Sequence, residues 1–259
     1  MCFDTDSTPP IPPRHQASSA AATPVTLTST DGTSFAAFLA RPEQSTGVGI
    51  VVLPDARGLF HFYELLAERL AEQGHTALAI DYFGRTAGLS PRDDKFPFME
   101  HIVQVTRQTI DADVAAAGDY LRGPSGGNCG TVFALGFCFG GRQAFLASAS
   151  RFGFAGAVGF YGMPGFYPNG AAGPTQHAAD LSAPILGLFG GADGGIPLKE
   201  IEGFDAALNA AGVKHEFVIY PGAPHSFFDI KYSEHAEACS DAWNRVLAFV
   251  KQHSTPPES

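Results

Sequence analysis

Residues 136–141 read Gly-Phe-Cys-Phe-Gly-Gly, which is the G-x-S-x-G nucleophile motif with cysteine in place of serine. The apolar run before it, residues 131–135, predicts a strand, and the helix formers in residues 142–149 predict a helix. A strand that enters a helix through so tight a turn strains its middle residue, and small neighbours are needed because the backbones crowd there. We therefore predict that Cys138 is presented above a sheet as a nucleophile, at a helix N-terminus that favours negative charge. The alternative is a buried and inert cysteine.

A second stretch of the chain also matches G-x-S-x-G. Residues 123–127 place Ser125 in the middle of the pattern, but they follow a helical stretch and precede a strand. That order is the reverse of the one the motif requires, and the proline and glycines are typical of an ordinary loop. We therefore predict that Ser125 is not a nucleophile.

The partners of a nucleophile at Cys138 are expected later in the chain, an acid first and then a histidine, each after a later strand. Asp193 lies among glycines directly after the buried strand 184–189, and His225 lies in a turn rich in Gly and Pro after the strand 215–220. Singly, a turn aspartate and a loop histidine are usually structural. Because all three residues come in the right order at strand ends, we predict a Cys138, His225 and Asp193 triad.

Together, these motifs resemble those of the dienelactone hydrolase family, the cysteine-nucleophile branch of the α/β-hydrolases. Residues 136–141 and 224–227 (Pro-His-Ser-Phe) resemble the nucleophile and histidine motifs of the family, and residues 159–162 (Gly-Phe-Tyr-Gly) resemble another strand end near its pocket. The resemblance covers residues 24–252 and implies an enzyme, a carboxylic ester hydrolase similar to carboxymethylenebutenolidase.

The resemblance also implies roles at other strand ends. Residues 53–58 resemble the segment that carries the oxyanion hole of the family, which implies backbone N–H donors at Ala56 and Phe139. In the same segment, Asp55 stands where the family has an acid, usually glutamate, that pairs with the resting thiol. Substrate contacts are expected from three side chains, Arg85 as a carboxylate clamp, Arg57 after it, and Tyr161. The alternatives are that Arg85 pairs with a nearby acid and that Tyr161 simply caps its strand.

One departure from the family bears on the substrate. Dienelactone enzymes carry a second carboxylate-binding arginine after the histidine motif, where this chain has Phe228 and Asp229. An acidic side chain there repels an anionic substrate. We therefore expect neutral esters to be preferred, unless Asp229 points to solvent or pairs with Lys231.

The composition limits the class of protein and of partner. The chain of 259 residues fits one α/β domain, and its net charge of −10 argues against nucleic-acid binding. No run of 18 apolar residues predicts a membrane span. The four cysteines fit neither a zinc pattern nor a disulfide framework. Since a thiol nucleophile needs a reducing compartment and residues 1–10 lack the pattern of a signal peptide, we predict a cytoplasmic protein.

The order of apolar strands and amphipathic helices predicts the fold. Residues 1–23 are expected to form an extended or disordered arm, and residues 24–259 a single domain that opens with a hairpin around Asp31-Gly32. Strands and helices then alternate, which predicts an α/β-hydrolase fold, a mostly parallel eight-stranded sheet with helices on both faces and an antiparallel N-terminal hairpin. Further strands are expected at 48–53, 76–81, 131–135, 155–161, 185–189 and 214–220, and helices near 61–73, 98–122, 141–150, 198–211 and 232–252. The loops 84–97 and 162–182 are expected to form pocket walls, with a lid as the alternative.

We therefore predict a hydrolase that cleaves ester or lactone bonds through a thioester acyl-enzyme, with no cofactor and no metal. The expected partner is a small-molecule ester or lactone, and the protein is expected to be a monomer or homodimer. One alternative is a promiscuous arylesterase or phosphotriesterase that acts on neutral activated esters. The other is a hydrolase-fold binding protein without catalysis.

Overall fold

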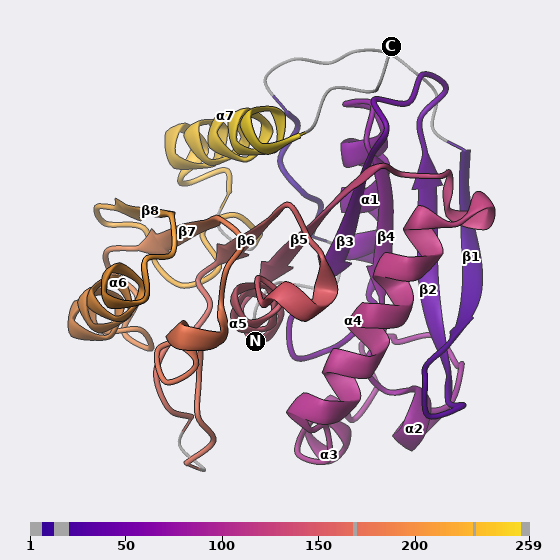
Figure 1. Ribbon diagram of the computed structural model, residues 1–259, viewed down its shortest axis with the longest axis horizontal. Coiled ribbons are helices and arrows are strands. Elements are labelled where there is room, and N and C mark those ends of the chain that lie inside the picture. The colour runs from indigo at the N-terminus through magenta and orange to yellow at the C-terminus, as the bar shows by residue number, and fades with distance from the viewer. Residues whose placement is uncertain (1–6, 13–20, 168–169, 230–231, 255–259) are drawn as a thin grey trace.

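The computed structural model describes residues 7–12, 21–167, 170–229 and 232–254. An eight-stranded sheet runs through the molecule in the order β1-β2-β4-β3-β5-β6-β7-β8, with helices on either side (Figure 1). The strands are β1 (Ala21–Thr28), β2 (Ser34–Arg41), β3 (Val48–Leu53), β4 (Thr76–Ile80), β5 (Thr131–Phe137), β6 (Gly156–Phe160), β7 (Ile185–Gly190) and β8 (His215–Tyr220). The longer helices are α1 (His61–Ala71), α4 (Arg107–Arg122), α5 (Phe139–Leu146), α6 (Leu198–Ala211) and α7 (Ala236–His253), and the short ones are α2 (Gly84–Ala87) and α3 (Phe98–Ile102).

The pairing of the strands confirms the predicted fold. β1 pairs antiparallel with β2, and β2 pairs antiparallel with β4, while all pairs from β4 through β8 are parallel. The carboxyl ends of the parallel strands therefore meet at one edge of the sheet, where sites form in such folds. Every residue of β3, β4 and β5 is buried, because helices cover both faces of a parallel sheet.

Contacts of aromatic rings show which helices share a face. On one face, the ring of Phe145 in α5 packs against that of Phe204 in α6, with centroids 5.3 Å apart. On the other face, Phe62 of α1 contacts Phe137 of β5 edge-on at 6.4 Å. Phe137 also packs against Phe228, which in turn contacts Trp243 of α7. Thus α1 and α7 cover the face of the sheet opposite α5 and α6.

One predicted helix is divided in two. The sequence predicts a continuous helix near 98–122, but α3 ends at Ile102 and α4 begins at Arg107. The Thr106 hydroxyl accepts a hydrogen bond from the backbone N–H of Thr109, and the Thr109 hydroxyl accepts one from the N–H of Thr106. This reciprocal cap satisfies backbone N–H groups at the start of a helix, so a new helix begins here. Threonine is more favourable at such a cap than in a helix interior.

The decoy motif is a loop, as predicted. Ser125 lies in a short 3₁₀ turn, Pro124–Gly126, between α4 and β5. A side chain at Gly126 would collide with the carbonyl oxygen of Tyr120, so the glycine serves the tight approach of this turn to α4.

The predicted N-terminal arm, residues 1–23, overlaps the first strand. β1 begins at Ala21, three residues inside the predicted arm, and residues 1–6 and 13–20 lie outside the described residues. Residues 7–12 lie against the body of the molecule, with Pro9, Pro10 and Pro12 buried. The indole N–H of Trp243 donates a hydrogen bond of 2.9 Å to the carbonyl of Pro10. A proline-rich segment suits this place because proline loses little further entropy when it is ordered.

None of the helices in the described part of the chain is long and apolar enough to cross a membrane.

We predict that Trp243→Phe lowers the free energy of unfolding by about 1–2 kcal/mol, because the buried Pro10 carbonyl loses its donor. Urea denaturation followed by circular dichroism measures the change. In a protein that lacks residues 1–12, the same substitution should cost much less. An equal cost in both backgrounds would show that the indole matters only for packing within α7.

Candidate active site

Cys138 occupies the turn between β5 and α5 in a strained conformation. Its φ of 52° lies in the left-handed region, where a residue with a side chain costs about 1–3 kcal/mol. A side chain at Gly136 would collide with the carbonyl of Gly140, and one at Gly140 would collide with the carbonyl of Leu53. The glycines of the motif are thus required by close backbone approaches, as expected for a tight strand-to-helix turn, and the role of Cys138 as a nucleophile stays a prediction.

Asp193 and His225 form a hydrogen-bonded pair. Asp193 follows β7, and its Oδ2 lies 2.6 Å from His225 Nδ1. Its Oδ1 accepts hydrogen bonds from the N–H groups of Gly195 at 2.8 Å and Ile196 at 3.2 Å. Burial opposes ionisation of the Asp193 carboxyl, but the His225 hydrogen bond and charge and the two backbone N–H groups together lower its pKa. The carboxylate is therefore held ionised and aimed at one nitrogen of the imidazole.

Tyr161 packs against the histidine and is hydrogen-bonded to Asp229. The Tyr161 ring packs against the His225 ring with centroids 5.0 Å apart, and its hydroxyl donates to Asp229 Oδ2 at 3.0 Å. Tyr161 and Asp229 are 0% and 1% exposed, respectively. Asp229 therefore does not point to solvent, and the expected repulsion of anionic substrates loses its basis. Lys231, its other expected partner, lies outside the described residues. The hydroxyl of Tyr161 is used in this contact, which favours a structural role over the expected substrate contact.

The order of the strands brings these groups to neighbouring strand ends. Cys138 follows β5, Tyr161 follows β6, Asp193 follows β7 and His225 follows β8. The N–H of Cys138 donates to the carbonyl of Phe160 at 3.0 Å, so the cysteine is tied to the strand end that carries Tyr161. Three of the four non-glycine residues with positive φ in the described chain, Cys138, Tyr161 and Ser226, lie here. Backbone strain of this kind concentrates at functional sites.

Cys138 lines a cavity of about 390 Å³. The predicted oxyanion donors Ala56 and Phe139 line the same cavity. Its other walls come from α3 and the start of α4, from α5, and from the connection between β6 and β7, and they are mostly apolar. The apolar lining residues are Met99, Ile102, Val103, Val105, Ile110, Leu146, Tyr167, Ala171 and Ala172, and the polar ones are Thr106, Arg107, Arg142 and Gln143.

The two loops expected as pocket walls fall on different cavities. Tyr167, Ala171 and Ala172 of the loop 162–182 line the Cys138 cavity, in agreement with the expectation. Within the loop 84–97, Leu89 to Arg92 line a separate cavity, and α3 takes the expected place beside Cys138.

Asp55 and Arg57 hold the segment that contains Ala56. The Asp55 side chain is fully buried, and its Oδ1 accepts a hydrogen bond of 2.8 Å from the N–H of Arg57. Its Oδ2 lies 3.3 Å from Arg57 Nη2, and its N–H donates to the hydroxyl of Tyr63 at 2.9 Å. These contacts fix the backbone on both sides of Ala56. The role of Asp55 as a thiol-pairing acid, and that of Arg57 in binding substrate, stay predictions.

Arg85 is committed to an ion-pair cluster. Its Nη1 and Nη2 donate to both oxygens of Asp113 in α4, at 2.7 and 2.9 Å, and its Nε donates to Asp31 of the hairpin at 2.8 Å. The hydrogen bond from Arg85 lowers the pKa of Asp31 to about 2. The structure thus favours the alternative stated above, an arginine that pairs with nearby acids, because the bidentate contact with Asp113 already fills the guanidinium fork.

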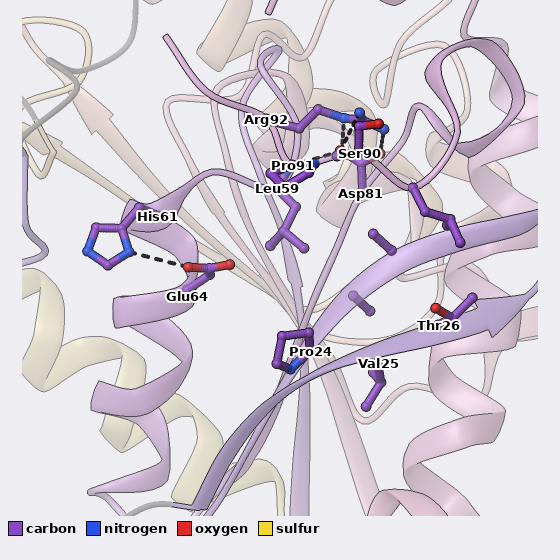
Figure 2. Close-up of a pocket in the computed structure, with 13 residues that line it drawn as sticks. Pro24, Val25, Thr26, Leu59, His61, Glu64, Asp81, Ser90, Pro91 and Arg92 are labelled. Carbon is purple, nitrogen blue, oxygen red and sulfur yellow. Dashed lines mark hydrogen bonds and ion pairs between the residues drawn. The ribbon is translucent and has the colours of Figure 1, made fainter.

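A second cavity, of about 410 Å³, lies between the N-terminal hairpin, the start of α1 and residues 88–92 (Figure 2). Asp81 and Arg92 form a buried ion pair in its wall, with 2.9 Å between Oδ2 and Nη2. The Asp81 oxygens also accept hydrogen bonds from the N–H groups of Leu59 and Phe83. Both oxygens are therefore engaged, and the ion pair anchors the end of β4. None of the predicted catalytic residues lines this cavity, whereas Cys138 lines the other one.

No group of three or more His, Cys, Asp or Glu side chains within the described ranges is arranged to hold a metal ion.

Comparison with known proteins identifies the family of the chain. Residues 35–254 match the model of the dienelactone hydrolase family. The chain belongs to the dienelactone hydrolase family. A relative from Yersinia pestis, provisionally assigned as a carboxymethylenebutenolidase, is 33% identical over 233 residues, which cover 86% of this chain and 85% of the relative. These matches confirm the predicted family and the prediction of a hydrolase.

Solved structures agree with the fold. A provisionally assigned dienelactone hydrolase from Klebsiella pneumoniae aligns with a TM-score of 0.75 and 29% identity, over 90% of this chain and 99% of that one. A dienelactone hydrolase-like promiscuous phosphotriesterase from metagenomic libraries aligns with a TM-score of 0.74 and 23% identity, over 90% of this chain and 99% of that one. At this identity, the second likeness bears on the fold alone.

Two arginines of this dienelactone hydrolase family member were not singled out by the sequence. Arg92 lies in a loop, and nothing in its neighbours predicts the pairing with Asp81. Arg142 directly follows the glycines of the nucleophile motif, and it counted only as a helix former. The signal that could have identified Arg142 is a charged residue at the fourth position after Cys138, on the buried face of a helix, where charged side chains are rare.

We predict that Arg85→Met lowers the free energy of unfolding by about 3 kcal/mol, because the buried Asp113 carboxylate loses its partner. The double variant Arg85→Met with Asp113→Asn should recover much of this loss. The ratio of kcat/KM for a carboxylate-bearing ester to that for a matched neutral ester should stay at the wild-type value. A selective loss for the carboxylate-bearing ester would restore Arg85 as a substrate clamp.

Proposed function

We propose that the protein hydrolyses carboxylic esters or lactones through a Cys138, His225 and Asp193 triad and a thioester intermediate. The observation that carries the proposal is the 2.6 Å contact between Asp193 and His225, at the sheet edge where Cys138 stands in its strained turn. A preformed pair of acid and base at the same sheet edge as the thiol supports catalysis rather than binding alone.

In the first half of the reaction, His225 Nε2 takes the proton of the Cys138 thiol, and the thiolate attacks the carbonyl carbon. The negative charge that develops on the carbonyl oxygen is received by the backbone N–H groups of Phe139 and Ala56, each worth about 3–4 kcal/mol in the transition state. Phe139 is the first residue of α5, where helical N–H groups have no partner within the helix. When the tetrahedral species collapses, the alcohol leaves with the proton from His225, and a thioester remains on Cys138.

In the second half, His225 takes a proton from water, and the hydroxide attacks the thioester carbonyl. The same N–H donors receive the oxyanion, the carbon–sulfur bond breaks, and Cys138 regains its proton from His225 as the acid departs. Asp193 keeps the proton-bearing Nδ1 directed toward itself and stabilises the imidazolium in both halves. The lowered pKa of Asp193 means that this charge is present at neutral pH.

A second candidate function, on neutral aryl esters with side activity on phosphotriesters, is supported by the walls of the cavity. Met99, Ile102 and Val105 present apolar side chains, and Phe139 and Tyr167 present aromatic rings stacked 6.4 Å apart. An aromatic leaving group fits such walls. A phosphoryl P=O oxygen fits the same oxyanion donors as an ester carbonyl.

The reducing compartment that a thiol nucleophile needs supports a cytoplasmic location, which stays part of this proposal, as does the monomeric or homodimeric state.

We predict that Cys138→Ala lowers kcat/KM for a chromogenic aryl ester by at least about 10³-fold, because the nucleophile is lost. Cys138→Ser should lose on the order of 10²-fold or more, since the histidine must then deprotonate a much weaker acid. Circular dichroism checks that both variants fold. Full activity of the alanine variant would exclude the mechanism, and an unchanged rate in the serine variant would make the thiol incidental.

The same variants allow a labelling test. Cys129 and Cys239 are buried, and burial raises the pKa of both thiols, that of Cys239 to about 12. Iodoacetamide should therefore modify Cys138 before either of them, and peptide mapping by mass spectrometry identifies the modified residue. Hydrolytic activity should fall in proportion to the modification of Cys138. Modification of Cys129 or Cys239 ahead of Cys138 would contradict the assignment.

We predict that neutral esters have at least about tenfold higher kcat/KM than carboxylate-bearing esters with the same leaving group, because a carboxylate against the apolar wall gives up its hydration. The two arginines in the cavity lining do not compensate, since Arg107 already pairs with Asp111 and Arg142 already donates to backbone carbonyls. Any turnover of a phosphotriester should disappear in Cys138→Ala. Equal rates for the neutral and anionic esters would remove the support for the second candidate.

A further inference from the structure

Arg142 is a buried arginine one turn beyond the nucleophile, and its side chain is 2% exposed. We define the wall segment as residues 163–167 and 170–172, the part of the connection between β6 and β7 that closes one side of the Cys138 cavity. Arg142 Nη1 donates to the carbonyls of Met163, at 3.0 Å, and Gly165. Arg142 Nη2 donates to those of Ala171, at 3.1 Å, and Ala172, at 2.8 Å. One guanidinium therefore joins both ends of the wall segment.

The charge of Arg142 is not used in an ion pair. Among the described residues, no carboxylate lies within ion-pair distance of its guanidinium, whereas Arg57, Arg85 and Arg92 each contact an aspartate. Burial lowers the pKa of Arg142, and the nearby Arg107 lowers it further. Burying a charge without a counter-ion is costly, so the four carbonyls must supply the compensation.

Other contacts also hold the wall segment. Within it, the N–H of Tyr167 donates to Ala171 at 3.0 Å, and that of Gly170 donates to Tyr167 at 2.8 Å. The N–H of Thr175, later in the same connection, donates to the carbonyl of Pro164 at 3.0 Å. Pro164 and Gly165 are buried, and Gly165 lies so close to Glu200 of α6 that a side chain would collide there, whereas Phe166 is exposed. The four hydrogen bonds from Arg142 connect this segment to α5.

A stack of rings extends from Arg142 to the oxyanion donors. The guanidinium carbon lies 4.0 Å from the centroid of the Tyr167 ring, and this ring lies nearly parallel to that of Phe139, at 14°. Phe139 meets Tyr82 edge-on with centroids 5.4 Å apart. The Tyr82 hydroxyl donates to the carbonyl of Pro54 at 2.9 Å, two residues before Ala56. Both segments that supply oxyanion donors are thus in contact with one end of this stack.

We propose that Arg142 is a positioning residue, which holds the wall segment and the Tyr167 ring against the Cys138 cavity so that the substrate side of the pocket is preformed. This inference rests on the proposed function for the reaction it serves. Arg142 acts through Tyr167, and Tyr167 contacts the substrate. The binding of a bulky apolar group therefore depends on Arg142, while the chemical step at Cys138 does not.

The test compares Arg142→Met, Arg142→Lys and Tyr167→Ala with wild type on two esters, one with a small acetyl group and one with a bulky aromatic acyl group. Arg142→Met should raise KM for the bulky ester about tenfold with kcat changed less than about threefold, because uniform binding is lost. The KM for the acetyl ester should change little. Arg142→Lys should not rescue the bulky ester, since a single ammonium cannot replace a planar fork that reaches carbonyls on both sides.

Arg151→Met is the matched control, because Arg151 also lies over an aromatic ring, that of Phe152 at 4.5 Å, but it is exposed and pairs with Asp111 of α4 rather than with the wall segment. It should leave both KM values at the wild-type level. The double variant Arg142→Met with Tyr167→Ala should be no worse than Tyr167→Ala alone, since the two residues act in series.

Hydrogen exchange supplies a readout that needs no turnover. In Arg142→Met, peptides that cover the wall segment should exchange faster than in wild type, while those of α1, on the opposite face of the sheet, should not change. Faster exchange throughout the protein would overturn the inference in favour of a general structural role, as would unchanged KM for the bulky ester or additive effects in the double variant. If Arg142→Met does not fold, Tyr167→Ala, at a half-exposed position, decides the matter, because an unchanged KM for the bulky ester in it overturns the inference.

These outcomes separate the inference from the proposed function. Absence of ester hydrolysis by the wild-type protein, or full activity in Cys138→Ala, would exclude the proposed function. The hydrogen-exchange comparison would still test whether Arg142 holds the wall segment. Normal triad behaviour with unchanged exchange in the wall segment would exclude only the role of Arg142.

Discussion

The close contact between the start of α5 and the end of β3 is the constraint on which the rest of the site depends. Gly140 lies so near the carbonyls of Leu53 and Pro54 that no side chain fits between them. This contact sets the abrupt passage from β5 into α5 and so the positive φ of Cys138. It also brings the first N–H of α5 beside the segment of Ala56, so one approach of two backbones positions the thiol and both expected oxyanion donors.

The buried charges around this contact are arranged in two ways. Arg57 and Arg92 each pair with an aspartate at the end of a strand, and these pairs hold the backbones of the loops that follow β3 and β4. Arg142 instead gives its hydrogen bonds to carbonyl oxygens. The first arrangement fixes loops next to the sheet, and the second orders a segment that lies farther from it and has no carboxylate of its own to offer.

The sequence predicts those parts of the molecule that depend on local patterns. Strands buried on both faces are continuous apolar runs, so their number and order could be read directly, and the glycines around Cys138 mark a turn that few other residues allow. Asp193 could be placed because it follows such a strand, β7, and His225 because it lies in a turn rich in Gly and Pro after the edge strand β8. The partners of Arg85 could not be predicted, because Asp31 and Asp113 lie far from it in the sequence and come near only through the hairpin and α4. The burial of Asp229 depends in the same way on Tyr161, 68 residues earlier.

Trp243 is the only tryptophan of the chain, and its position gives the protein a built-in optical probe. Its ring packs against Phe228, three residues after His225, while its N–H binds the N-terminal segment at Pro10. The tryptophan emission of the protein therefore reports on a single point, where the first described residues, the last helix and the loop that carries His225 meet. A change in emission on ligand binding registers movement of that loop rather than an average over the molecule.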